Sequence, residues 1–171
     1  MKRTITGLVI ALCAFSIPSF ANTQDEYIQR ALEAASKYAD SIACGVSEIS
    51  AGNVAALVPY DGEDRYEAKY AVIWTGDIEC YGGSGTTSTN IAMVHIGGGD
   101  TFFVKPELSS PLVSLELYSS RSSAKVIDSG SDYIILEGFD YHPSGKDPGC
   151  CPSLKIKKVI KPDNKGNWIA Q

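Results

Sequence analysis

The stretch Asp147-Pro148-Gly149-Cys150-Cys151-Pro152-Ser153 holds two adjacent cysteines between two prolines, just before the last apolar run of the chain. Only two other cysteines, Cys44 and Cys80, follow a predicted signal peptide. Disulfides among these four residues would join the end of a predicted helix, the middle of the chain and its C-terminal part. Cysteines used in this way are structural and do not act as nucleophiles. The sequence therefore predicts a small domain that is held together covalently.

Residues 1–21 have the features of a secretory signal peptide: a short basic start, an apolar core over residues 7–15 and a small-x-small ending. The apolar core is too short to cross a bilayer as a stable helix. Cleavage after Ala21 would remove Cys13, and removing 21 of the 171 residues leaves 150. That length suits a single domain with one core, over residues 22–171. We therefore expect a periplasmic or secreted bacterial protein without a membrane span.

The charge of the exported chain is acidic. Loss of Lys2 and Arg3 with the signal peptide changes the formal net charge from −5 to −7. An acidic surface disfavours nucleic acid and favours solubility or a basic partner. Five lysines gather near the C-terminus: Lys155, Lys157, Lys158, Lys161 and Lys165. The rest of the surface is therefore more acidic than the net charge suggests.

An amphipathic helix is predicted over residues 23–44. Thr23 and Glu26 have the spacing of a capping box, in which their side chains satisfy free amides at a helix start. Behind them, apolar residues recur at three- and four-residue steps and form one stripe: Ile28, Ala31, Leu32, Ala35, Tyr38, Ala39 and Ile42. Gly45 is the expected stop.

After Gly45 the pattern changes to short β-rich runs separated by turn residues. Within residues 66–78, one alternating apolar face is formed by Ala68, Tyr70, Val72 and Trp74. Residues 112–118, 124–127 and 133–139 also alternate. Short turns between successive strands imply an antiparallel meander. The expected fold class is α+β, with the N-terminal helix packed on a curved antiparallel meander sheet of about seven strands.

Four cysteines allow three disulfide connectivities. Adjacent Cys150 and Cys151 can bond to each other only through a strained ring, and this geometry favours two long-range bridges. However, Cys44 follows the helix and Cys80 ends a strand, so a Cys44–Cys80 bridge asks little of the backbone. We place that bridge slightly ahead, with Cys150 and Cys151 left as a vicinal pair or as free thiols.

The segment after Cys80 is poor in apolar residues and predicts an exposed loop. A loop held at its base by a cysteine is a common place for function. We predict that this loop binds a partner through Tyr81, Gly82, Gly83, Ser84, Gly85, Thr86 and Thr87.

No motif indicates a catalytic, metal or cofactor site. Adjacent cysteines do not match the C-x-x-C spacing of zinc or redox sites. The Gly82-Gly83-Ser84-Gly85 run fails as a nucleophile elbow, because Thr86 stands where the last glycine should be. His95 and His142 have no neighbours at ligand spacing, so a structural role is preferred for both. Triads assemble in space, so a secreted hydrolase that uses Ser84 or Cys80 stays open as an alternative.

The Cys-Cys motif, with the alternating basic strand and terminal Trp168 that follow it, resembles the C-terminal part of exported bacterial proteins of the LppP/LprE kind and related uncharacterised secreted proteins. The resemblance covers about a quarter of the chain, and a lipobox is missing here. It implies an envelope location and a small disulfide-bearing domain. It implies no catalytic residues.

Together these features predict a non-enzymatic protein that binds a macromolecular partner. A sharper form of the prediction is an inhibitor or immunity protein against a cell-wall hydrolase or toxin, whose cleft the Gly/Ser/Thr loop could enter. Besides the hydrolase, a second alternative is a structural accessory of an envelope or secretion apparatus.

Overall fold

The computed structural model describes residues 20–47, 49–60, 63–82, 86–113, 115, 123–149, 151–164 and 167–171, with side chains from Gln24 onward. One helix is followed by two four-stranded antiparallel sheets, and each sheet follows chain order. The helix is α1 (Phe20–Ile42). Sheet A contains β1 (Val54–Val58), β2 (Lys69–Gly76), β3 (Ser88–Ile96) and β4 (Phe102–Val104). Sheet B contains β5 (Lys125–Gly130), β6 (Tyr133–Asp140), β7 (Leu154–Pro162) and β8 (Trp168–Ala170).

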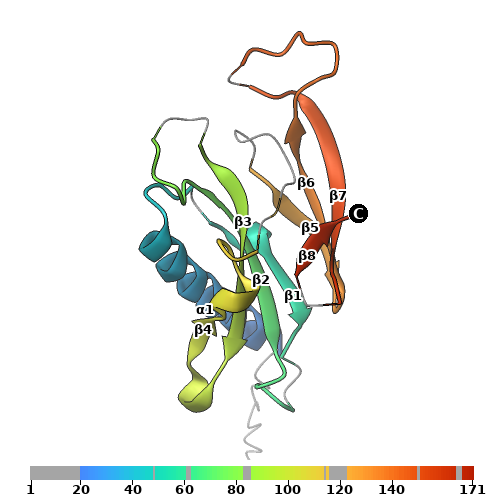
Figure 1. Ribbon diagram of the computed structural model, residues 1–171. Coiled ribbons are helices and arrows are strands. Elements are labelled where there is room, and N and C mark those ends of the chain that lie inside the picture. The colour runs from blue at the N-terminus through green and yellow to red at the C-terminus, as the bar shows by residue number, and fades with distance from the viewer. Residues whose placement is uncertain are drawn as a thin grey trace, which may run out of the picture.

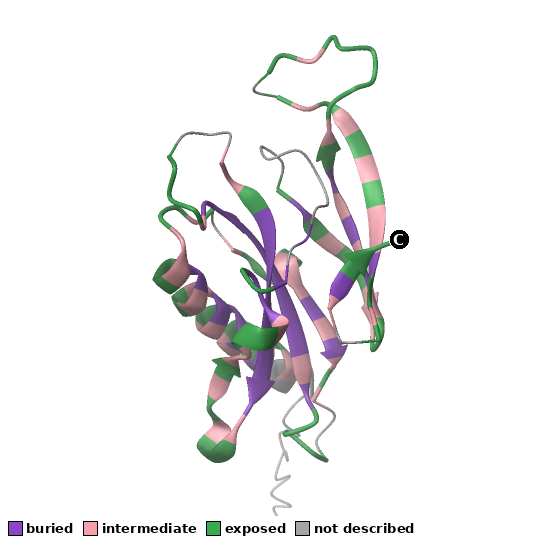
Figure 2. Ribbon diagram, viewed as in Figure 1, coloured by how far each residue is buried: buried purple, intermediate pink, exposed green. Residues whose placement is uncertain are grey.

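The elements form three layers, with sheet A between α1 and sheet B (Figure 1). Every residue of β2 after Lys69 and every residue of β3 after Ser88 is buried, because both faces of these strands are covered (Figure 2). The core between the sheets includes Ile73 and Ile91 from sheet A and Ile134, Leu136, Ile160 and Trp168 from sheet B. The core under the helix includes Tyr70, Val72, Trp74, Ala92, Val94 and Ile96.

The expectation of one meander sheet of about seven strands is wrong. The chain divides its strands between two sheets that pack face to face. The alternating face predicted within residues 66–78 does exist, but it faces the helix, and Ala71 and Ile73 between its members face sheet B. A strand buried on both faces has a continuous apolar run in place of clean alternation. The run Tyr70-Ala71-Val72-Ile73-Trp74 was thus the signal of a second layer.

The helix prediction is confirmed, except at its start. The helix already includes Phe20, so Thr23 does not begin it as a capping box requires. It ends at Ile42, shortly before Gly45. Its buried face consists largely of alanines, which let the helix axis approach the sheet closely: Ala31, Ala35 and Ala39 are fully buried, beside Tyr27 and Leu32. No helix in the described part of the chain is long and apolar enough to cross a membrane.

The strand predicted over residues 112–118 is not found among its described residues. Leu112 lies in a turn, and Val113 and Leu115 are irregular but buried in the core between the sheets. The other residues of this segment lie outside the described part. Val113 and Leu115 therefore contribute apolar contacts to the core without a place in either sheet.

Arginine and aromatic side chains close the end of sheet A where β3 turns into β4. Arg30 of α1 donates to the carbonyl of Asp100 and lies 4.4 Å above the ring centroid of Phe102. Arg65 pairs with the Asp100 carboxylate. The Tyr27 ring stacks on Tyr60, with centroids 4.7 Å apart. These contacts bind the helix to the β3–β4 turn. The longer loop between β2 and β3 lies at the opposite end of the sheet.

Candidate functional site

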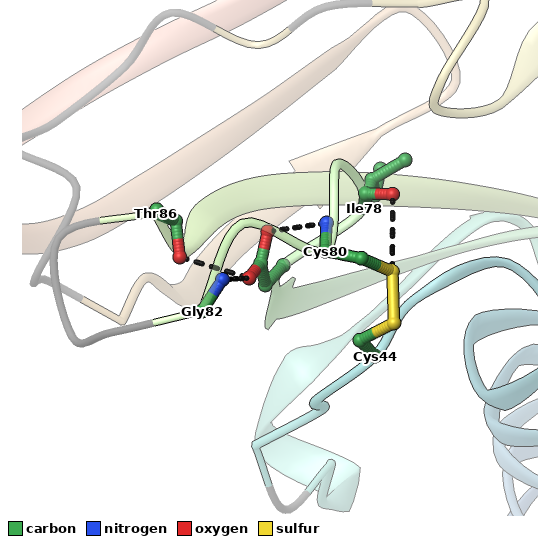
Figure 3. Close-up of a disulfide and its surroundings, with 6 residues drawn as sticks. Cys44, Ile78, Cys80, Gly82 and Thr86 are labelled. Atoms are coloured by element: carbon green, nitrogen blue, oxygen red, sulfur yellow. Dashed lines mark hydrogen bonds between the residues drawn. A yellow bond between two sulfur atoms is a disulfide. The ribbon is translucent and has the colours of Figure 1, made fainter.

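The loop between β2 and β3 starts at a disulfide. Cys44, just after α1, is bonded to Cys80, with the sulfurs 2.04 Å and the Cα atoms 5.2 Å apart. The predicted Cys44–Cys80 pairing is therefore confirmed. Cys80 Sγ also lies 3.8 Å from the carbonyl oxygen of Ile78; since a disulfide sulfur carries no hydrogen, this is a contact only (Figure 3). The bridge holds the loop against the segment that leaves the helix.

Asp77 organises the base of this loop. Its Oδ1 accepts the amide of Cys80 at 3.0 Å. Its Oδ2 accepts the amide of Gly82 at 3.0 Å and the hydroxyl of Thr86 at 2.9 Å. The three donors converge on one carboxylate beside the disulfide (Figure 3). One buried side chain thus joins both arms of the loop.

The backbone of Asp77 joins the loop to the segment after the helix. Its amide donates to the carbonyl of Gly45 at 3.0 Å, and its carbonyl accepts the amide of Cys44 at 2.9 Å. A side chain on Gly76 would collide with the Gly45 carbonyl, because an added Cβ would lie 2.7 Å from that oxygen. Close approach of the two segments therefore depends on glycine at this position.

The hydrogen bonds decide the charge of Asp77. Burial of this side chain, which is only 6% exposed, raises the pKa of its carboxyl. Hydrogen bonds from the Gly82 amide, the Thr86 hydroxyl and the Cys80 amide outweigh burial and lower the pKa below its ordinary value. Asp77 is therefore a carboxylate at neutral pH. This agrees with its contacts, because an ionised carboxylate only accepts hydrogen bonds.

Two residues of the loop have left-handed backbone conformations. Gly82 has φ 74° and Cys80 has φ 61°. This region is costly for a residue with a Cβ, and such a conformation persists only where the surroundings fix it. At Cys80 the disulfide and the hydrogen bond to Asp77 supply that constraint. The loop is therefore held in one conformation at its base.

Shallow pockets flank the loop base on two sides. One, of about 320 Å³, lies between the loop and the turn at Pro111, and Glu79 and Thr86 line it. The other, of about 340 Å³, lies against the segment from Cys44 to Ser47, and Asp77 lines it. Among the described residues, Asp77 and Glu79 are the charged members of the two linings, which there include no lysine or arginine. The concave surface around the loop is therefore acidic.

Exposed apolar side chains lie beside these pockets. Tyr81, between two residues fixed by Asp77, is 77% exposed. Leu112, next to Pro111 in the pocket lining, is 71% exposed. Gly83, Ser84 and Gly85 of the predicted binding loop lie outside the described residues. Thr86 and Thr87 each line a pocket.

The predicted candidates for hydrolase chemistry do not come together among the described residues. Cys80 is half of a disulfide, so it offers no thiolate while that bond is intact. Ser84 lies outside the described part. His142 is exposed in a turn, where its Nδ1 lies 2.9 Å from the hydroxyl of Ser144 and also accepts the Ser144 amide at 3.2 Å. The imidazole of His142 therefore stabilises a turn.

His95 is buried on β3, 8% exposed, and its Nε2 has no hydrogen-bond partner among the described residues. Burial, with help from the charges of Lys105 and Lys69, lowers the pKa of His95 to about 4, although Glu107 acts in the opposite sense. A neutral imidazole packed near Phe103 is a core side chain. The described residues contain no group of three histidine, cysteine or acidic side chains that could hold a metal ion.

A second carboxylate organises the loop between β6 and β7. Asp147 Oδ2 accepts the amides of His142 at 2.6 Å and Ser153 at 3.1 Å, and its Oδ1 accepts the Ser153 hydroxyl at 2.6 Å. The Ser153 hydroxyl, followed by the His142 amide, lowers the pKa of Asp147. Cys151 is itself disulfide-bonded, and its partner lies outside the described residues.

The sequence reasoning named neither Asp77 nor Asp147 as an organising residue. The available signal was an aspartate placed before a turn that contains glycine and cysteine, a position where its side chain bonds to the backbone ahead. Both loops lie at the same end of the molecule (Figure 1).

No family model, curated protein or solved structure matches this chain significantly. The resemblance of the Cys-Cys motif to LppP/LprE-like proteins therefore stays a prediction. The geometry of the loop, its charge and its exposed side chains are the basis on which function can be argued.

Proposed function

We propose that this is an exported, non-enzymatic protein that binds a macromolecular partner through the loop between β2 and β3. The observation that carries the proposal is the placement of Tyr81. This side chain is 77% exposed, while its two neighbours are fixed by the disulfide and by Asp77. Exposed tyrosines on rigid supports are typical anchors of protein interfaces.

A fixed loop base lowers the cost of binding. A flexible loop loses conformational entropy when it is ordered on a partner, whereas a loop that is already ordered does not. The disulfide, the three hydrogen bonds to the Asp77 side chain and the backbone bonds to Gly45 and Cys44 order the base of this loop in the free protein. The disulfide is also typical of proteins that fold in an oxidising compartment.

The partner we propose is basic. Exposed Glu79 places a negative charge on the surface at the loop, with the Asp77 carboxylate buried beneath it, and the whole chain has a formal net charge of −5. Complementary charge raises the rate of association and rejects partners of like charge. In its sharper form, the proposal is an inhibitor or immunity protein whose loop enters the cleft of a basic cell-wall hydrolase or toxin.

The test uses two exposed tyrosines at opposite ends of sheet A. Tyr81 precedes β3 and is 77% exposed, and Tyr66 precedes β2 and is 56% exposed. The mature protein and its Tyr81→Ala and Tyr66→Ala variants are added to a panel of basic cell-wall hydrolases, and cell-wall lysis is measured at low and high salt. We expect wild type and Tyr66→Ala to inhibit one member, more strongly at low salt, and Tyr81→Ala to lose at least about tenfold in affinity.

Equal inhibition by both variants would place the interface elsewhere. If no hydrolase is inhibited and immobilised protein captures no specific basic partner, the proposal fails. Specific labelling of Ser84 by a fluorophosphonate would favour the hydrolase instead.

A further inference from the structure

The outer face of sheet B is a second surface with a distinct character. It is the face turned away from sheet A, and we name it the basic face after its members Lys125, Lys155, Lys157, Lys161, Phe139 and Ile169. We propose that the basic face docks on an anionic lipid surface. This inference is independent of the partner proposed for the β2–β3 loop.

The antiparallel register gathers three lysines around one carboxylate. Glu137 on β6 lies opposite Lys125 on β5 and opposite Lys157 on β7. Lys155 reaches it from the side, with Nζ 2.8 Å from Oε1. Lys161 adds a fourth ammonium group further along β7, and Asp128, opposite Ile135 in the same outer rows, adds a second carboxylate. Two carboxylates do not neutralise four ammonium groups. A positive surplus therefore remains on this face of a chain that is acidic as a whole.

Apolar side chains stand among the lysines. Phe139 lies opposite Lys155 and is 44% exposed, and Ile169 lies opposite Lys161 and is 44% exposed. Ile127, in the bulge of β5, is 42% exposed. In Figure 2, the first five residues of β7 alternate between half-buried and exposed, whereas β3 is buried after its first residue. The basic face is thus amphipathic, and none of the described elements covers it.

A lipid surface fits this combination better than a second copy of the chain. Two copies joined by a twofold axis through this face would bring lysines against lysines. Lipid phosphates instead meet the lysine ammonium groups, while apolar side chains enter the boundary between headgroups and acyl chains. Acidic surface elsewhere is repelled by the same lipids, so the molecule can approach only through the basic face.

The experiment is co-flotation of the mature protein with vesicles of phosphatidylcholine alone or mixed with phosphatidylglycerol. The variant Lys125→Gln/Lys157→Gln removes two charges and leaves the Lys155–Glu137 ion pair. The control Lys37→Gln/Lys105→Gln changes the net charge equally, on α1 and beside β4. We expect wild type and control to float with the anionic vesicles at low salt only. Lys125→Gln/Lys157→Gln should bind these vesicles at least about tenfold more weakly.

Equal binding to both kinds of vesicle, or equal loss in the two variants, would overturn the proposal. So would sedimentation that shows a dimer abolished by Lys125→Gln/Lys157→Gln, or capture of an acidic protein by the basic face without flotation, because each assigns this face to a different occupant.

Discussion

Sheet A and sheet B have the same number of strands in the same order, but they differ in how many faces they bury. Sheet A is covered by α1 on one side and by sheet B on the other, so its central strands are buried throughout. Sheet B is covered on one side only, and β6 alternates between buried Ile134, Leu136 and Gly138 and the outer residues between them. The buried sheet therefore determines stability, and the half-covered sheet offers surface.

The loops at the shared end of the two sheets differ in a similar way. Each has an aspartate that accepts hydrogen bonds from both arms of its loop. Asp77 in the sheet A loop is buried and stands next to a long-range disulfide. Asp147 in the sheet B loop is only partly buried. An aspartate that joins the two arms of a loop is thus buried in the sheet A loop and lies at the surface in the sheet B loop.

Removal of the long-range disulfide should have the largest effect. The double variant Cys44→Ala/Cys80→Ala opens a loop closed over a sequence separation of 36 residues, and the unfolded chain gains the corresponding entropy. We expect the free energy of unfolding to fall by about 4 kcal/mol, measured by urea denaturation. Reduction of wild type should cost at least as much, because Cys151 is also disulfide-bonded. An unchanged urea midpoint in the double variant would contradict the assigned role.

Truncation in the doubly buried sheet is the next largest change. Ile73→Ala leaves a cavity between the sheets at a residue that is 0% exposed, and should cost about 3 kcal/mol in urea denaturation. The matched change Ile127→Ala removes the same atoms from a side chain that is 42% exposed, and should cost under about 1 kcal/mol. Equal costs would show that sheet B is also covered on its outer face.

The comparison of the sheets also explains which features could be predicted from the sequence. Alternation along β6 and the apolar stripe of α1 are local patterns, so their residues could be assigned correctly. Division into two sheets depends on whether Ala71 and Ile73 meet a second layer, and a single alternating face of β2 already satisfied the meander hypothesis. Periodicity shows which residues of a strand face the same way, but it does not show what lies opposite them.

The candidate site could be predicted in part for a related reason. Two local features, the end of a helix and the end of a strand, placed the Cys44–Cys80 bridge slightly ahead of bridges to Cys150 and Cys151. Asp77 was missed because its role depends on three-dimensional contacts with Gly45 and Thr86, which no local pattern contains. The basic face required the register of β5, β6 and β7, since only the register brings Lys125, Glu137 and Lys157 into one row.

Sheet A buries an imidazole, whereas no ionisable side chain is among the buried residues described in sheet B. The folded-state pKa of His95 is about 4, below its ordinary value of 6.5, so the unfolded state binds more protons between these values. Stability should therefore fall as the pH drops from 6.5 towards 4, by about 2–3 kcal/mol. In His95→Leu this part of the pH dependence should disappear in urea denaturation, and an unchanged profile would contradict it.

The smallest expected effect is local, and it should differ between Asp77→Asn and Asp147→Asn. In Asp77→Asn, one side-chain atom becomes an NH₂ donor, and either orientation sets it against a backbone N–H, that of Cys80 or that of Gly82. In Asp147→Asn, the NH₂ can face the Ser153 hydroxyl, which can rotate to accept, while the remaining oxygen still accepts the amides of His142 and Ser153. We therefore expect faster hydrogen exchange at Cys80 and Gly82 in Asp77→Asn, and little change at His142 and Ser153 in Asp147→Asn.

Acid should reproduce, in the wild-type protein, the loss of protection from hydrogen exchange at Cys80 and Gly82 that is expected for Asp77→Asn. Because hydrogen bonding lowers the pKa of Asp77 below its ordinary value of 3.8, its contribution to stability is complete above that pH. The contribution is lost as the pH falls through the lower folded-state value, when a proton occupies one of the acceptor sites. Similar exchange rates at Cys80 and Gly82 in wild type and Asp77→Asn would show that the disulfide alone fixes the base of the loop. The buried carboxylate of Asp77 would then have no greater structural role than the partly buried carboxylate of Asp147.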